Sequence, residues 1–314
     1  MYLKRLTIVI VICFATAYVI GMYFDHAYQK RWSTLFFSKT DALIKDDTNY
    51  DIIFLGNSRV HFGINPFYVD SMTRLNSYNF ANGGADAEDI LLTATVYLQK
   101  HPAPKLAIIS LDQGALKVNE SLKTCFHYLY YLDNDTIQKY MRAAGHNTTL
   151  MSILPFTKYS FFDEYNRTSL FLPGKEYPVF DHNIYKGFLN IHREMNSNAA
   201  GLYNIKYGTE KLWDTAITYF RNTIEALQKK NVIVVFVSPP EKISSAVRNT
   251  AFRNTTDSVF ETLAKEYHLR HLHFENDPVY TDGYFVDDIH LNEPGSRVYS
   301  KQLADSIKNI LLLK

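Results

Sequence analysis

The sequence contains little cysteine and almost no net charge. Its 314 residues include two cysteines, Cys13 and Cys125, which cannot form a disulfide framework, so we interpret both as free thiols. The formal net charge is +1, and no zinc-finger spacing is present. Nucleic-acid binding usually requires a basic surface or such a motif, and we therefore expect no nucleic-acid partner.

Phosphate-binding loops are missing as well. The glycines of "NGGADAED" (residues 82–89) are followed by acidic residues and by no lysine, so a phosphate would meet negative charge there. At 46% hydrophobic residues, the chain has enough apolar material for one large globular domain or two small ones.

The N-terminus carries a long uncharged run, "LTIVIVICFATAYVIGMYF" (residues 6–24). Its length suits a helix that crosses a bilayer, and we predict a short tail and transmembrane anchor over residues 1–24. A cleavable signal peptide is the rival interpretation, because Ala15-Thr16-Ala17 has the form of a cleavage site. A buried helix is a third. Basic residues flank the run on both sides, so the positive-inside rule barely decides its orientation.

After a polar connector over residues 25–49, short apolar runs alternate with longer amphipathic ones. Such strands, apolar on both faces and separated by helices, predict a parallel sheet covered on both sides, and hence a three-layer α/β/α fold. We predict strands within 51–56, 77–84, 106–112, 232–240 and 269–277, and helices over 86–100, 209–230, 244–267 and 296–313. Asn65-Pro66 and Asp86 have the residue types that begin helices.

Residues 115 to about 205 interrupt this alternation. The segment is rich in tyrosine, phenylalanine, asparagine and proline, and it contains no repeat. A connection of this length usually forms a lid or a binding elaboration, and we interpret it as an insertion within the domain formed by residues 50–314. A purely structural subdomain is the alternative, because aromatic residues more often form a core than a sugar-binding platform.

Serine, histidine and aspartate are available at the edge of the predicted sheet where ligands collect in such folds. Ser58 directly follows the first strand, and the C-terminal "VDDIHLNEPG" (residues 286–295) follows the last. A serine hydroxyl becomes a nucleophile when an imidazole takes its proton, and the imidazole needs an acceptor on its other nitrogen. We therefore expect Asp287 to orient His290 towards Ser58.

Two sequence blocks carry a resemblance to a known family. The combination of "FLGNSR" (residues 54–59) with "DDIHLN" (residues 287–292) resembles the SGNH (GDSL-like) hydrolase superfamily, whose first block supplies the serine and whose last supplies Asp-x-x-His. The resemblance covers residues 50–314 apart from the insertion, and implies a flavodoxin-like, five-stranded parallel sheet. "GINP" (residues 63–66) and the N-terminal apolar helix resemble its envelope-bound branches, which acetylate exopolysaccharides or help to transfer D-alanine to teichoic acids.

The resemblance assigns roles by position. Ser58 would be the nucleophile, His290 the base and Asp287 its partner. "YNFANGGA" (residues 78–85) resembles the second block, so the backbone N–H of Gly84 would stabilise the oxyanion together with that of Ser58. The third block departs from the family's Gly-x-Asn-Asp, because this chain has Asp112-Gln113-Gly114-Ala115; the Gln113 amide is our candidate substitute for the missing asparagine.

The neighbours of these residues have structural interpretations. Asn57 serves the turn or points into the site, and Arg59 binds a carboxylate within the fold, Asp287 or Asp112. Ser58 could be a plain turn residue, and Gly84 could be present for positive φ. His290 could be a helix-capping or surface histidine, and Asp287 or Asp288 could cap the last helix.

A metal site is a rival constellation. His271 and His273 alternate on one strand and share a face, so that with Asp287 or His290 they could form a ligand set. The usual helical His-x-x-x-His and the cysteine pairs are missing, however, and two histidines on an edge strand are commonly solvated. We therefore expect no metal and no cofactor.

Three functional hypotheses remain. The first is a serine-dependent esterase or O-acyltransferase that acts on acyl esters, acetyl esters in particular, of an envelope glycan, from a membrane-anchored domain on the periplasmic or extracellular side. The second is a catalytically silent protein that binds glycan or scaffolds a membrane-bound O-acyltransferase. The third is a metal-dependent hydrolase. We favour the first.

Overall fold

Five short strands form one parallel sheet. The computed structural model describes residues 2–32, 38–117, 125–154, 157–158, 185–191, 211–242 and 251–312. Every neighbouring pair of strands is parallel, and their order is β2-β1-β3-β4-β5. The strands are β1 (Ile52–Leu55), β2 (Ser77–Asn79), β3 (Leu106–Ser110), β4 (Ile233–Ser238) and β5 (Arg270–His273). This is the flavodoxin-like order, and it confirms the predicted fold class.

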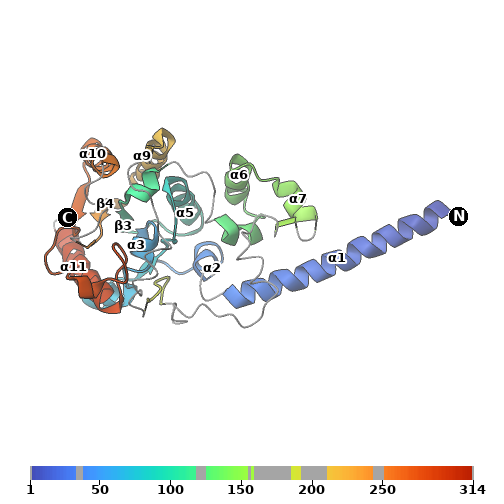
Figure 1. The fold of residues 1–314 in the computed structure, drawn as a ribbon, viewed down its shortest axis with the longest axis horizontal. Helices are drawn as coiled ribbons and strands as arrows, with labels where there is room; N and C mark the ends of the chain where they lie inside the picture. Colours follow the sequence, from blue (N-terminus) through green and yellow to red (C-terminus); the bar gives the residue numbers. More distant parts are fainter. Residues whose placement is uncertain are drawn as a thin grey trace. The chain divides into compact units, whose positions relative to one another are not determined.

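Strands β1 to β4 are almost entirely buried because helices cover both faces of the sheet, whereas β5 at its edge is partly exposed. On one face, alternate strand residues such as Phe54 and Ile108 pack in a core with α4 (Pro66–Thr73) and α11 (Glu293–Leu312). The other face carries α5 (Ala87–Lys100) and α9 (Asp214–Gln228), which contact each other. Figure 1 shows α9 on one side of β3 and β4 and α11 on the other. Full burial stabilises each large apolar side chain by about 1.5–3 kcal/mol, so packing outweighs local strand propensity here.

The expected helix signals are found at the helix starts. The Asn65 side chain accepts a hydrogen bond from the Phe67 N–H and Pro66 occupies the first turn, so Asn65 caps α4. At the start of α5, Asp86 and Asp89 form a reciprocal capping box. The predicted helices over 209–230 and 296–313 correspond to α9 and α11. The third, over 244–267, corresponds to α10 (Ala251–Glu266), and residues 244–250 lie outside the described part of the chain.

The chain divides into two compact units. One comprises Met1–Phe37 with Cys125–Tyr177, and the other comprises Ser38–Thr124 with Pro178–Lys314. The first contains α1 (Tyr2–Trp32), the 3-10 helix η3 (Cys125–Tyr130), α6 (Asp135–Ala143) and α7 (Thr148–Ile153). Within α1, the segment Tyr2–His26 has a mean hydropathy of 2.3, which is apolar enough for a membrane span and also for a signal sequence.

The predicted connector and insertion differ from a simple linker and loop. Residues 38–44 of the connector form a helix, α2 (Ser38–Ile44), whose Lys39 and Leu43 are buried in the sheet-containing unit. The ring of His101 contacts the carbonyls of Leu43 and Thr48 at 3.1 Å each, which ties this helix to the end of α5. Much of the predicted insertion over 115–205 lies outside the described residues, and its described part over 125–154 belongs to the first unit.

Candidate active site

A glycine directs the chain out of β1. Gly56 has φ +150, and a Cβ atom built there would lie 2.8 Å from the Cβ of Ser110, so the loop passes too close to β3 for a side chain. Ser58 then opens a one-turn helix, α3 (Ser58–His61). The Asn57 side chain caps this helix, because its Oδ1 accepts a hydrogen bond from the Arg59 N–H at 3.1 Å. Of the two predicted roles of Asn57, the turn is the one observed.

A buried asparagine fixes the segment after Ser58. Asn79, at the end of β2, donates through Nδ2 to the carbonyls of Val60 and Ile64 at 2.8 Å each. Its Oδ1 accepts from the Ala81 N–H at 3.1 Å, so the whole amide is engaged. The sequence analysis missed this role. An asparagine at the end of a buried strand must form hydrogen bonds within the protein, so its position could have indicated it.

The C-terminal block forms a closed turn. The Val286 N–H donates to the His290 carbonyl at 2.9 Å, and one Asp287 oxygen, Oδ1, accepts from the backbone N–H groups of Ile289 and His290. The start of α11 is capped instead by Asn292, whose Oδ1 accepts from the Gly295 N–H at 3.0 Å. The alternatives in which His290, Asp287 or Asp288 caps the last helix are therefore wrong.

Ser58, His290 and Asp287 form a continuous hydrogen-bonded chain. The Nε2 atom of His290 lies 2.8 Å from Ser58 Oγ, and its Nδ1 lies 2.6 Å from Asp287 Oδ2. A carboxylate only accepts hydrogen bonds, so Nδ1 carries the ring proton and Nε2 presents its lone pair to the serine hydroxyl. This is the tautomer in which an imidazole can remove the proton of a serine.

The charge of Asp287 is maintained by its contacts. Burial by itself raises the pKa of the Asp287 carboxyl, but the hydrogen bond and charge interaction with His290, together with two backbone N–H groups, bring the pKa below its ordinary value. Asp287 therefore remains ionised at neutral pH and can stabilise a positive charge on the ring.

A second histidine lies one turn after Ser58. The ring of His61 stacks on Phe62 at 4.7 Å between centroids, and the Phe62 ring meets His290 edge-on at 5.6 Å. Burial, followed by the nearby charges of Lys39 and His290, lowers the pKa of His61 well below its usual value. His61 is thus neutral at pH 7. The ring that contacts Ser58 and Asp287 is that of His290.

The buried side chain of Arg59 connects the loops that surround Ser58. Its guanidinium contacts Asp112 Oδ2 at 3.2 Å, and Asp112 is one of the two carboxylates expected for it. It also donates to the carbonyls of Pro239 and Pro240 at 2.5 and 3.2 Å, and lies 3.5 Å from Glu241. Sequence reasoning missed the two proline carbonyls and Glu241 as partners of Arg59. The "SPPE" segment (residues 238–241) held a signal, because prolines have no N–H and their segment cannot form regular backbone pairing, which leaves its carbonyls available to a side-chain donor. The arginine links the exits of β1, β3 and β4.

The other predicted site residues follow β2 and β3. Gly84 has φ +79, a backbone conformation that favours glycine. The turn therefore explains the glycine by itself, independently of any role of its N–H in binding an oxyanion. Gln113 begins the 3-10 helix η2 (Gln113–Leu116), which Asp112 caps through a 2.7 Å hydrogen bond from the Gly114 N–H. Within the described residues, the backbone N–H groups of Ser58 and Gly84 donate no hydrogen bond and remain available to a ligand.

The rival metal set is not assembled as expected. His290 and Asp287 are engaged with Ser58, whereas His271 and His273 lie together with Glu261, a residue of α10 that the sequence analysis did not consider. The expected combination of these histidines with Asp287 or His290 is therefore wrong, because β5 directs them towards α10.

No protein-family model and no curated protein matches the sequence. Several solved structures are similar in chain trace. A member of the lipolytic protein G-D-S-L family from Veillonella parvula is 11% identical, with a TM-score of 0.40 over 82% of this chain and 97% of that one. A lipase/acylhydrolase from Enterococcus faecalis is 13% identical, with a TM-score of 0.38 over 82% and 95%. An acetyl xylan esterase is 14% identical, with a TM-score of 0.40 over 82% and 98%.

Proposed function

We propose that this protein is a serine-dependent esterase or O-acyltransferase that acts on acyl esters, acetyl esters in particular, of an envelope glycan. The observation that carries the proposal is the chain of contacts from Ser58 Oγ through the His290 ring to the Asp287 carboxylate, at 2.8 and 2.6 Å. Both contacts are within the range required for proton transfer, and the Asp287 carboxylate remains ionised at neutral pH.

The reaction would proceed in two halves. Ser58 Oγ attacks the ester carbonyl while His290 Nε2 takes the hydroxyl proton, and the positive ring is stabilised by Asp287. The ester C–O bond then breaks, the leaving alcohol receives the proton from His290, and the acyl group stays on Ser58. In the second half, His290 removes a proton from water or from a sugar hydroxyl, and the oxygen of that molecule attacks the acyl carbon. The bond from this carbon to Ser58 Oγ then breaks, and His290 returns the proton to Ser58 Oγ. Water gives hydrolysis and the sugar gives transfer.

Three donors are proposed for the oxyanion of the tetrahedral intermediate: the backbone N–H groups of Ser58 and Gly84 and the side-chain amide of Gln113. Each well-placed donor contributes about 3 kcal/mol to lowering the barrier. Asp112 is engaged with Arg59 and with the η2 backbone, so it serves as support for the neighbouring Gln113 and not as a donor.

The setting of the reaction is part of the proposal. The apolar helix Tyr2–His26 supports attachment to a membrane, with the sheet-containing unit on the periplasmic or extracellular side, where envelope glycans are found. The likeness of the "GNSR" and "GINP" segments to envelope-bound branches of the SGNH superfamily supports a glycan ester as substrate and a membrane-bound O-acyltransferase as a partner.

The experiment is the release of acetate from 4-nitrophenyl acetate and from an acetylated glycan. The Ser58→Ala variant should lose about 10⁴-fold or more in kcat, because it removes the hydroxyl that lies 2.8 Å from His290 Nε2. Ser71→Ala, an exposed serine of α4, is the matched control and should keep full activity. A fluorophosphonate should label the wild type and the control but not Ser58→Ala. Unchanged turnover in Ser58→Ala would refute the proposal.

A catalytically silent protein is the second candidate, favoured by the segment Asp112-Gln113-Gly114-Ala115, which lacks the asparagine of the superfamily's Gly-x-Asn-Asp. It predicts glycan binding without turnover. Calorimetry on Ser58→Ala would then show unchanged glycan affinity, and the wild type would react with no fluorophosphonate.

A further inference from the structure

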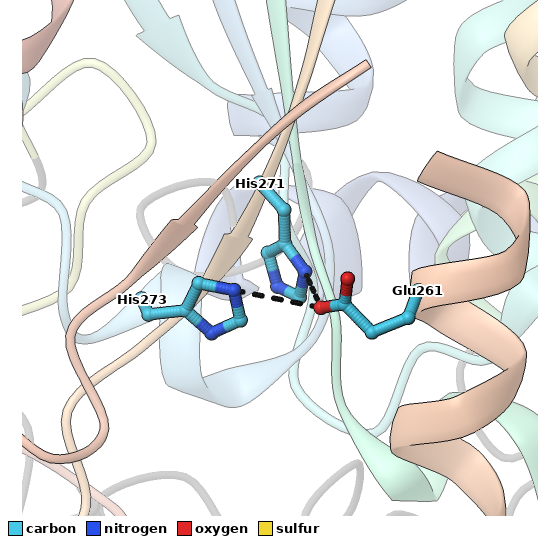
Figure 2. A group of neighbouring side chains, drawn as sticks. All are labelled: Glu261, His271 and His273. Atoms are coloured by element: carbon cyan, nitrogen blue, oxygen red, sulfur yellow. Dashed lines mark hydrogen bonds and ion pairs between the residues drawn. The ribbon is translucent and has the colours of Figure 1, made fainter. Parts of the chain in front are cut away.

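Two histidines and a glutamate converge on one point at the edge of the sheet. Figure 2 shows the rings of His271 and His273, from β5, turned towards the carboxylate of Glu261, which projects from α10. His271 Nδ1 lies 2.6 Å from Glu261 Oε1, and His273 Nε2 lies 3.5 Å from the same oxygen. One nitrogen or oxygen atom from each residue lies within 4.8 Å of the others.

The contacts of His273 leave two acceptors facing each other. Its Nδ1 lies 2.9 Å from Glu275 Oε1, and a carboxylate only accepts, so Nδ1 carries the ring proton. In the tautomer with its single proton on Nδ1, Nε2 carries a lone pair directed at Glu261 Oε1, which is also an acceptor. Such a pair is repulsive unless a positive charge lies between the two atoms.

The second nitrogen of His271 also has a partner. Its Nε2 lies 2.8 Å from Ser238 Oγ. A hydroxyl both donates and accepts, so Ser238 satisfies the ring whether the proton is on Nε2 or on Nδ1. Without a metal, Nδ1 carries the proton, because the Glu261 carboxylate 2.6 Å away only accepts. A metal bound to Nδ1 would take the place of this proton, and the ring proton would then lie on Nε2, where Ser238 Oγ accepts it. Both rings thus have an outer partner of the kind that orients metal-binding histidines.

The two rings and the carboxylate enclose a common point. The ring centroids are 3.8 Å apart, and both rings contact the same oxygen of Glu261. A single divalent cation at this point would satisfy the carboxylate and one nitrogen lone pair from each ring together.

We propose that Glu261, His271 and His273 bind one divalent zinc-type cation. Two imidazoles and a carboxylate are a common ligand set for zinc, and a fourth position remains open for water. The His271 side chain is 9% exposed, while those of His273 and Glu261 are 49% and 44% exposed, so the ion has access from solvent. The bound ion joins the edge strand β5 to α10, and it is separate from the proposed ester chemistry at Ser58.

The test is isothermal titration of zinc chloride into the full chain, purified in detergent and stripped with a chelator. We expect one zinc per chain. The variants His273→Ala and Glu261→Gln, which alter partly exposed side chains, should each bind zinc about tenfold more weakly or worse, and Glu275→Gln should lose about tenfold through the outer contact to His273. Zinc should also raise the melting temperature of the wild type but not of His273→Ala.

His268→Asn is the matched control, because His268 lines the same surface pocket and its φ of +53 is tolerated by asparagine. It should keep the wild-type zinc affinity. Absence of stoichiometric binding, binding that survives the substitution of His273 and Glu261, or equal weakening by His268→Asn would each overturn the site. Ester turnover of the zinc variants should equal that of wild type, so this test is independent of the serine.

Discussion

Ser58 and His290 are separated by 232 positions in the chain, yet His290 Nε2 lies 2.8 Å from Ser58 Oγ. The parallel sheet produces this contact, because the loop after β1 and the turn before α11 both lie at the carboxyl edge of the strands. Arg59 then ties the serine helix to the exit of β4, and the Asp288 carbonyl accepts from the Lys242 N–H at 2.9 Å, which ties the histidine turn to the same exit. Both partners of the contact are thus fixed to one part of the sheet.

We expect Asp287→Asn to lower kcat by about 10²- to 10⁴-fold, because an amide no longer forces the ring proton onto Nδ1 or stabilises a charged imidazole. KM should change much less. The matched control is Asp288→Asn, an adjacent, exposed carboxylate, which should keep its activity. The measurement is steady-state kinetics with an acetyl ester. Equal losses in the two variants would mean that general negative charge, and not the contact with His290, is what matters.

The pH dependence of stability should also depend on Asp287. Its pKa is lowered in the folded protein, so it contributes stability above its unfolded-state pKa, and this contribution is lost as the pH falls through the folded-state value. We expect the difference in unfolding free energy between wild type and Asp287→Asn to narrow between about pH 5 and about pH 2. Urea unfolding at a series of pH values measures it. A difference that stays constant would contradict the prediction.

Sequence reasoning predicted those features that depend on patterns along the chain. The apolar runs predicted all five strands, and the capping residues Asn65 and Asp86 were placed correctly, because caps and buried strands are determined locally. The approach of His290 and Asp287 to Ser58 could also be anticipated, since in a parallel sheet every strand ends at the same edge.

Contacts between loops could not be predicted in the same way. The Glu241 carboxylate meets Arg59 because of the path that the chain takes after β4, and Glu261 meets His271 because one side of α10 faces the edge strand. Neither pairing has a spacing that can be read from the sequence. The helix over Ser38–Ile44 was missed because its burial depends on tertiary contacts and its own residues, including Lys39 and Thr40, are largely polar.

Replacing Arg59 with alanine should destabilise the protein by about 3–5 kcal/mol. Two proline carbonyls lose their buried donor, and the Asp112 and Glu241 carboxylates each lose a cation, although Glu241 keeps its contact with Arg253. The Arg59 side chain is 3% exposed, and a lysine could not reach all of its partners, so Arg59→Lys should also be destabilising. Arg221→Ala is the control. That arginine pairs with Glu266 at the surface, where both side chains are about 40% exposed, and its loss should cost less than about 1 kcal/mol. Urea unfolding midpoints compare the three.

The last prediction concerns the turn that places the nucleophile. Gly56→Ala would place a methyl group 2.8 Å from the Cβ of Ser110 at a φ of +150, so the loop between β1 and α3 must shift. We expect a loss of stability of about 1–3 kcal/mol. We also expect kcat to fall by about 10²-fold, because a displacement of about 1 Å separates Ser58 Oγ from His290.

Gly283→Ala is its matched control, since a Cβ there meets nothing within 4 Å. This variant should keep both its stability and its turnover. Fluorophosphonate labelling rates for Gly56→Ala, measured well below its melting temperature, separate misplacement of the serine from unfolding. If Gly56→Ala loses stability but its folded fraction is labelled as fast as wild type, the close approach of β1 to Ser110 matters for packing alone, and the serine is positioned by the Asn79 contacts to Val60 and Ile64.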